Sequence, residues 1–129
     1  MATQTVHKGY GGKAEFEVLA SAARTADTTS DDFVVPYGKT LALIINRTAS
    51  AATPSVVPTI RGVTPDAIVY DVLVGAAITG TGTTVLRVGA GCPETTNLST
   101  GMPLPATWRL FMDASDADSL TYSVRAEVS

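Results

Sequence analysis

Apolar and polar residues alternate along much of the chain, beginning near residue 14. In the segment Ala14–Arg24, Phe16 and Val18 fall on one side of an extended backbone, and Glu15 and Glu17 fall on the other. Because successive side chains of a strand point to opposite faces, this period of two predicts a half-buried β-strand.

Seven further segments have the alternation or the branched apolar residues that favour strands. They are residues 28–35, 40–47, 55–63, 67–74, 83–89, 107–113 and 120–128. No stretch repeats apolar residues at the spacing of three and four that an amphipathic helix needs. Roughly eight short strands separated by turn residues are typical of an all-β fold, so we predict an antiparallel β-sandwich or squat barrel.

The strands also differ in where they are expected to lie. Residues 40–47 contain two consecutive isoleucines and form the most apolar run, which predicts a central strand. Residues 55–63 contain Pro58 and follow Pro54, and proline cannot donate to a sheet ladder, so an edge strand is predicted there. Residues 107–113 and 120–128, joined by a short acidic turn, are expected to pair as an antiparallel hairpin.

The alternation also predicts which side chains form the core. Trp108 and Tyr122 are expected to point inward from neighbouring strands and to anchor the core, because aromatic side chains dominate core burial. A sugar-stacking role for an exposed Trp108 is the alternative. The predicted inward set is Phe16, Leu43, Ile45, Trp108, Leu110, Tyr122 and Val124.

Two segments fall outside the strand pattern. Residues 1–13 contain three glycines and few apolar residues, which predicts a flexible N-terminal arm ahead of a single β domain at 14–129. His7, Lys8 and Tyr10 are its candidate partner-binding residues, and simple disorder of a chain end is the alternative. Residues 89–105 are long and irregular, so they are expected to be functional or to cover a sheet edge.

The composition narrows the classes of function. The chain has 129 residues and a net charge of −3, and its nine Lys and Arg form no run, so nucleic-acid binding is not expected. No segment approaches the ~20 apolar residues of a membrane span. Charged residues make up only 16%, which suits lasting contacts with other proteins, although small β domains often share this composition.

The first residues and the single cysteine, Cys92, set the expected cellular context. The N-terminal sequence MATQT lacks the basic and apolar regions of a secretory signal. One cysteine cannot form a disulfide within the chain, so synthesis in a cytoplasm is expected.

Candidate catalytic residues are few. His7 is the only histidine and lies in the arm, and no orienting group lies near Cys92 in the sequence. Acid–base or nucleophilic catalysis needs such groups held together, so we expect neither an enzyme nor a cofactor.

Acidic residues are grouped in one late turn, formed by Asp113, Asp116 and Asp118. Calcium binds several carboxylate oxygens, which makes this group a candidate metal site. The spacing lacks the calcium-loop pattern, and Asp also favours turns by bonding the nearby backbone. We therefore expect a turn here, and likewise at Asp27, Asp31 and Asp32.

Five segments stand out by their sequence: 20–25 (ASAART), 53–62 (TPSVVPTIRG), 76–88 (AAITGTGTTVLRV), 104–109 (LPATWR) and 117–124 (ADSLTYSV). Together they resemble a family of small tailed-bacteriophage virion proteins, and the resemblance covers most of residues 20–128. It implies a structural protein of the head-decoration, or cement, type, located on the head surface of the virion. The implied partners are the major capsid protein and further copies of the chain, as a trimer or dimer. A tail, neck or fibre protein and a carbohydrate-binding sandwich for host attachment are the alternatives.

Overall fold

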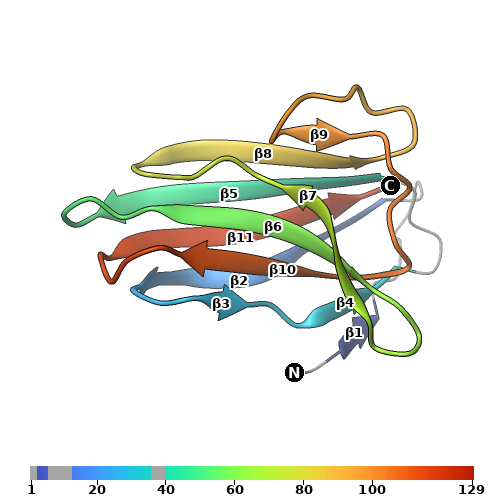
Figure 1. The fold of residues 1–129 in the computed structure, drawn as a ribbon, viewed down its shortest axis with the longest axis horizontal. Helices are drawn as coiled ribbons and strands as arrows, with labels where there is room; N and C mark the ends of the chain where they lie inside the picture. Colours follow the sequence, from blue (N-terminus) through green and yellow to red (C-terminus); the bar gives the residue numbers. More distant parts are fainter. Residues whose placement is uncertain (1–2, 6–12, 36–39) are drawn as a thin grey trace.

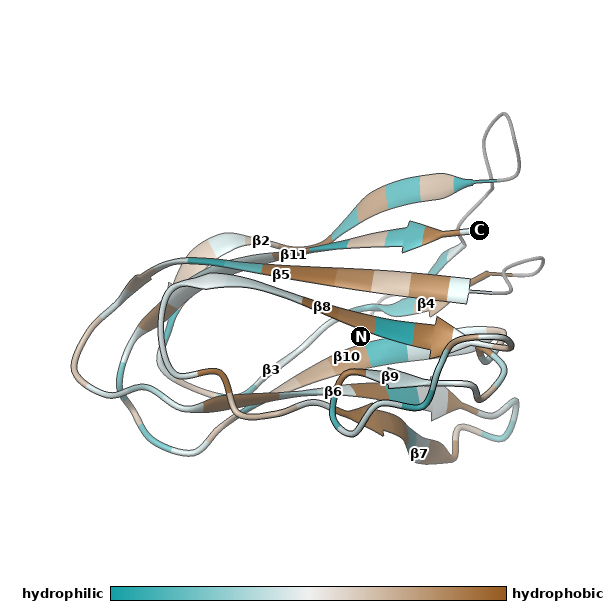
Figure 2. Ribbon diagram, turned by 90° about the horizontal axis from the view of Figure 1, so that it is seen from above, coloured by the Kyte–Doolittle hydropathy of each residue, from teal (hydrophilic) through white to brown (hydrophobic). Residues whose placement is uncertain are grey.

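The computed structural model describes residues 3–5, 13–35 and 40–129. Two β-sheets overlap in the view of Figure 1 and are seen as two layers, packed face to face as a sandwich, in Figure 2, and within the described residues every regular element is a strand. The predicted all-β sandwich is therefore confirmed. No helix in the described part of the chain is long and apolar enough to cross a membrane.

The strands divide between a sheet that we call A and a sheet that we call B. Sheet A has the order β1-β4-β10-β6-β7, with β3 also pairing with β10, and sheet B has the order β2-β11-β5-β8-β9. The strands of sheet A are β1 (Thr3–Thr5), β3 (Thr28–Thr29), β4 (Asp32–Val34), β6 (Val56–Val63), β7 (Val69–Val74) and β10 (Thr107–Ala114). The strands of sheet B are β2 (Ala14–Arg24), β5 (Thr40–Ser50), β8 (Gly82–Gly89), β9 (Ser99–Thr100) and β11 (Leu120–Val128).

The pairing follows a simple rule along the chain. Four antiparallel pairs are nested along the chain: β2 with β11, β4 with β10, β5 with β8, and β6 with β7. Of these strands, those nearest the two chain ends pair with each other, and those nearest the middle pair with each other. The chain is thus a long hairpin wound into two sheets, which is the topology of a jelly roll.

The predicted hairpin of the last two long strands is wrong. Strand β10 lies in sheet A and β11 lies in sheet B, so the turn between them crosses from one layer to the other (Figure 2). Both strands bury every second residue, and that period fits two strands facing each other across a core as well as two lying side by side. Trp108 and Tyr122 therefore point inward from opposite sheets rather than from neighbouring strands.

The predicted edge position of β6 is also wrong, because β6 lies between β10 and β7. The carbonyl of Pro58 accepts a 2.7 Å hydrogen bond from the Gly75 N–H, just beyond the end of β7. The Pro58 nitrogen points to the same side of β6 as its carbonyl, beyond the last residue pair between β6 and β7. The N–H that proline lacks is therefore not needed for a pair of this ladder. The central position predicted for residues 40–47 is confirmed, since β5 lies between β11 and β8.

The segment predicted as one strand at residues 28–35 is instead two short strands, β3 and β4. The break falls at Ser30, whose hydroxyl oxygen accepts the Leu110 N–H at 2.9 Å. A side-chain oxygen thus takes a bond that a strand carbonyl would otherwise accept.

The core lies between the sheets and matches the prediction. Of the predicted inward residues, all are buried except Phe16, which is half-buried and packs against the core. The rings of Phe16 and Trp108 each lie 5.0 Å from the ring of Phe33, measured between centroids. Tilted aromatic contacts of this kind join β2 of sheet B to β4 and β10 of sheet A.

Each of the two segments predicted to lie outside the strand pattern contributes a short strand to the edge of a sheet. Within the expected arm, Thr3–Thr5 forms β1 and pairs in parallel with β4 at the edge of sheet A, and Gln4 Nε2 donates to Asp31 Oδ2 at 2.7 Å. His7, Lys8 and Tyr10 lie outside the described residues. In the long segment 89–105, β9 pairs in parallel with β8, so this segment covers an edge of sheet B.

Candidate functional site

The acidic turn uses its carboxylates to hold the backbone. Asp118 Oδ2 accepts hydrogen bonds from the Thr53 N–H at 3.1 Å and from the Thr53 hydroxyl at 3.3 Å. Asp116 Oδ1 accepts the Asp118 N–H at 3.1 Å. Asp113 is exposed on β10. Among the residues that the structure describes, no three His, Cys, Asp or Glu side chains gather where they could hold a metal ion.

The second acidic group is divided among three partners. Asp27 Oδ1 accepts the Ala114 N–H at 2.8 Å, which ties the β2–β3 turn to the end of β10. Asp31 bonds Gln4 of β1, and Asp32 bonds Arg109 of β10. These three carboxylates therefore point to different elements and form no common site.

Trp108 is a core residue with no exposed surface. A buried ring cannot stack on a sugar, so the sequence-based alternative that used Trp108 as a carbohydrate platform is wrong. Its indole Nε1 is buried and has no hydrogen-bond partner among the described residues. Such an unsatisfied donor reduces what the ring contributes to stability.

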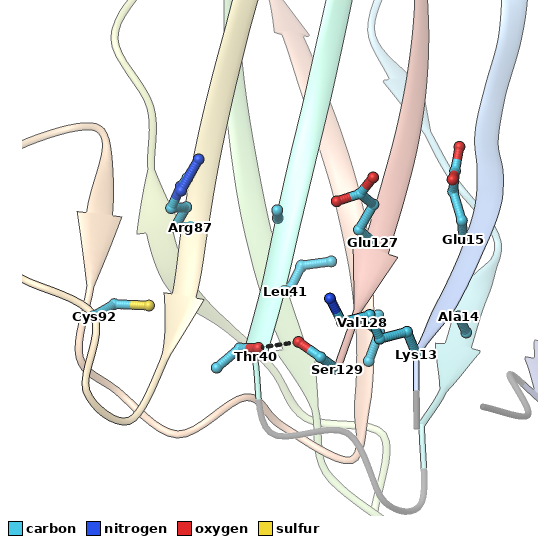
Figure 3. Close-up of a pocket in the computed structure, with 11 residues that line it drawn as sticks. Lys13, Ala14, Glu15, Thr40, Leu41, Arg87, Cys92, Glu127, Val128 and Ser129 are labelled. Atoms are coloured by element: carbon cyan, nitrogen blue, oxygen red, sulfur yellow. Dashed lines mark hydrogen bonds between the residues drawn. The ribbon is translucent and has the colours of Figure 1, made fainter. Parts of the chain in front are cut away.

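A solvent-open hollow of about 470 Å³ lies at one end of sheet B (Figure 3). Strand register places Glu15, Glu127, Ala42 and Arg87 in one row across β2, β11, β5 and β8 on the outer face. The short side chain of Ala42 leaves space between the carboxylate of Glu127 and the guanidinium of Arg87.

Charge is unevenly distributed around this hollow. Glu15 and Glu127 lie directly opposite each other, and Arg125 compensates the first, with its Nε 3.3 Å from Glu15 Oε1. Cys92, which is half-buried, lines the side near β8. The described lining offers charges for a protein contact, but it places no base beside the thiol.

Arg47 has no carboxylate partner among the described residues, and its guanidinium instead bonds oxygens of a nearby turn and strand. Arg47 Nε donates to the Gly80 carbonyl at 2.7 Å, and its other nitrogens bond Thr84 and the Thr81 carbonyl. Burial lowers the pKa of the Arg47 guanidinium. Arg47 thus holds the glycine-rich turn between β7 and β8, which is turn chemistry and not a phosphate site.

The outer face of sheet A carries two ion pairs. Arg61 Nε lies 3.0 Å from Asp71 Oδ1, and the Arg61 guanidinium also covers the ring of Phe111, 4.3 Å from its centroid. Arg109 bonds both carboxylate oxygens of Asp32, at 2.6 and 3.0 Å. The guanidinium fork matches a carboxylate in this bidentate geometry, so both charges are compensated within the molecule.

Exposed apolar side chains gather on β7 and the turn before it. The exposed fractions are 58% for Ile68, 39% for Val69, 40% for Tyr70 and 43% for Val74. Figure 2 shows β7 as an apolar strand at the outer side of sheet A. The sequence predicts only a strand here, although the apolar residues on both sides of a single Asp71 are a visible signal of this exposed surface.

Comparison with known proteins identifies a shared fold. No protein-family model matches the chain, and no curated protein matches it. A crystal structure of the SPBc2 prophage-derived protein YomS is similar, with a TM-score of 0.54 and 14% sequence identity. The similarity covers 90% of this chain and 91% of that chain, so the two proteins share the whole sandwich.

Proposed function

We propose that this protein is a structural component of a tailed-bacteriophage virion, and that it decorates the outer surface of the head. The observation that carries the proposal is the shared sandwich with a prophage-derived protein, which extends over 90% of this chain. The resemblance of residues 20–128 to small phage virion proteins supports the same role. A decoration protein needs a stable body with binding surfaces, and it needs no catalytic group.

The physical mechanism is stabilisation by selective binding. A protein that bridges neighbouring capsid subunits binds only the assembled shell, so its binding free energy adds to the stability of that shell. Several weak contacts per copy are sufficient, because linked contacts reinforce one another. The sandwich presents two broad outer faces, and the charges on the outer face of sheet A are already compensated within the molecule.

Sedimentation with purified virion parts tests this role. The full-length protein is mixed with undecorated heads, and separately with purified tails, below saturation. We expect it to sediment with heads, to saturate at a fixed number of copies per shell, and to raise the temperature at which heads open. Binding to tails alone would assign the protein to the tail, neck or fibre, and binding to neither would contradict a virion role.

The N-terminal segment is expected to contribute to attachment. Deleting residues 2–12 removes β1, which pairs with β4 along only three residues, all of them exposed. We expect the sandwich to remain folded, with an unchanged circular dichroism spectrum, and head binding to weaken. Equal occupancy of heads by truncated and full-length protein would show that the β domain alone carries attachment.

A further inference from the structure

One row of side chains crosses four strands on the outer face of sheet B. Its members, in order across β2, β11, β5 and β8, are Glu15, Glu127, Ala42 and Arg87. Arg125 compensates Glu15, with its Nε 3.3 Å from Glu15 Oε1. Glu127 and Arg87 are exposed, and neither forms an ion pair with another described residue. The row therefore keeps one acidic and one basic side chain without a partner in the described part of the molecule.

These two charges lie at fixed places on either side of β5. Figure 3 shows Glu127 on β11 and Arg87 on β8, and both line the hollow above Ala42. Neighbouring strands are about 4.8 Å apart, so the two side chains leave the sheet ~10 Å from each other. Lys13 lines the end of the same hollow and forms no ion pair with a described residue. The hollow is thus acidic on the β11 side and basic on the β8 side.

The surface beside this row carries little further charge along β5 and β8. In the next row the half-buried Ile44 lies beside Val85, and in the row after it Asn46 lies beside Thr83. Arg87 is the one charged side chain at the outward positions of β5 and β8, two strands that the structure describes throughout. The centre of this face therefore offers no charge that would oppose close approach of another flat surface.

We propose that the outer face of sheet B binds the same face of a second copy of this chain, around a two-fold axis that runs along β5. Strand β5 is the third of the five strands of sheet B, so this axis passes through the middle of the face. Rotation about the axis lays Ala42 over Ala42 of the other copy and exchanges the two sides of the row. Glu127 of each copy then faces Arg87 of the other, and one contact forms two ion pairs.

The order of the charges favours a second copy as the occupant of this face. An occupant needs a cation over Glu127 and an anion over Arg87, ~10 Å apart and in the reverse order. A second copy turned over about β5 carries that reversed pair at the same spacing. The hollow above Ala42 gives the long side chains room to meet, and closing it excludes water, which strengthens the attraction between the charges. The inference goes beyond the virion role and concerns the isolated protein.

Charge reversal tests the contact on the purified full-length chain, with light scattering during gel filtration as the readout. We expect the wild type to have the mass of two chains at high concentration and of one chain on dilution. Glu127→Arg and Arg87→Glu each oppose like charges at two points, and each should raise the dissociation constant ~100-fold or more. The swap Glu127→Arg/Arg87→Glu restores both ion pairs in reversed order, and its dissociation constant should return to within ~10-fold of the wild-type value.

Asp66→Arg is the matched control, because it changes the net charge as Glu127→Arg does but lies in the exposed turn between β6 and β7 of sheet A. It should leave the dissociation constant unchanged, and circular dichroism shows whether each variant is folded. A wild type that stays monomeric at every concentration, single reversals without effect, or a folded swap variant that stays monomeric would each overturn the inference. No readout needs phage heads, so failure here is distinguishable from failure of the proposed function.

Discussion

The ring of Tyr70 lies directly over the backbone of Gly62, its partner in the adjacent strand. A Cβ placed on Gly62 would lie 2.4 Å from Tyr70 Cζ and 2.5 Å from the hydroxyl oxygen. The glycine thus makes room for the Tyr70 ring. In the strand register Gly62 lies between Trp108 of β10 and Tyr70 of β7, the edge strand of sheet A.

We predict that Gly62→Ala lowers the free energy of unfolding by about 1–3 kcal/mol, because the methyl group displaces the ring. In a Tyr70→Ala background the same change should be neutral or stabilising, since alanine loses less backbone entropy than glycine in a strand. Denaturant unfolding of the four proteins of this cycle gives the coupling. An equal effect of Gly62→Ala in both backgrounds would contradict the contact.

Trp108 is expected to be the largest single contributor to the core. Trp108→Ala should cost ~3–5 kcal/mol, because it removes a fully buried ring that contacts Phe33 and Phe16. Trp108→Phe should cost less, since it keeps a ring and removes the unsatisfied indole N–H. The chain has one tryptophan, so wild-type unfolding can be followed by its fluorescence and that of the variants by circular dichroism. Unchanged stability of Trp108→Ala would contradict its core position.

The two ion pairs of sheet A should differ in importance. The side chains of Arg109 and Asp32 are 18% and 15% exposed, so Asp32→Ala leaves a largely buried guanidinium without its partner. We expect a loss of roughly 1–3 kcal/mol there. Asp71→Ala is the control, and it should cost less than about 1 kcal/mol, because Asp71 is 55% exposed. Melting temperatures check both, and a larger effect at Asp71 would reverse the assignment.

A metal chelator should leave the melting temperature unchanged, because the carboxylates of the β10–β11 turn bond the backbone. Asp118→Ala should instead lower the free energy of unfolding by ~1 kcal/mol, through loss of the bonds to Thr53. Asp113→Ala, at an exposed neighbouring position, is the control. A fall in melting temperature on chelation that calcium reverses would show that these carboxylates bind metal.

Periodicity predicted the long strands and the core of this protein, but not the short strands β1 and β9, the break between β3 and β4, or the arrangement of the sheets. The alternation in β2 and β11 predicted their bounds, and the alternation in β10 and β11 placed Trp108 and Tyr122 inward. It could not show that β10 and β11 belong to different sheets, because a buried face looks the same in either arrangement. The edge position predicted from Pro58 is wrong for a related reason: a proline is tolerated in a central strand where the neighbouring ladder ends, and that end depends on tertiary structure.

The candidate surfaces were harder to predict than the fold. The hollow at Ala42 and the surroundings of the exposed strand β7 both depend on which strands are neighbours, and no local pattern contains that information. Glu15 and Glu127, for example, are far apart in the sequence and meet only through the pairing of β2 with β11. The apolar excess at Ile68 and Val69 is local, and it is the one feature of these surfaces that the sequence displays.

We propose that this chain lies on the outside of a phage head, and a cryo-electron microscopy reconstruction of the intact particle is the sharpest test. We expect density for the two-sheet sandwich on the outer surface of the shell, in contact with more than one capsid subunit. Density for the sandwich only at the tail or neck, or a particle that lacks it altogether, would show that the proposed position is wrong.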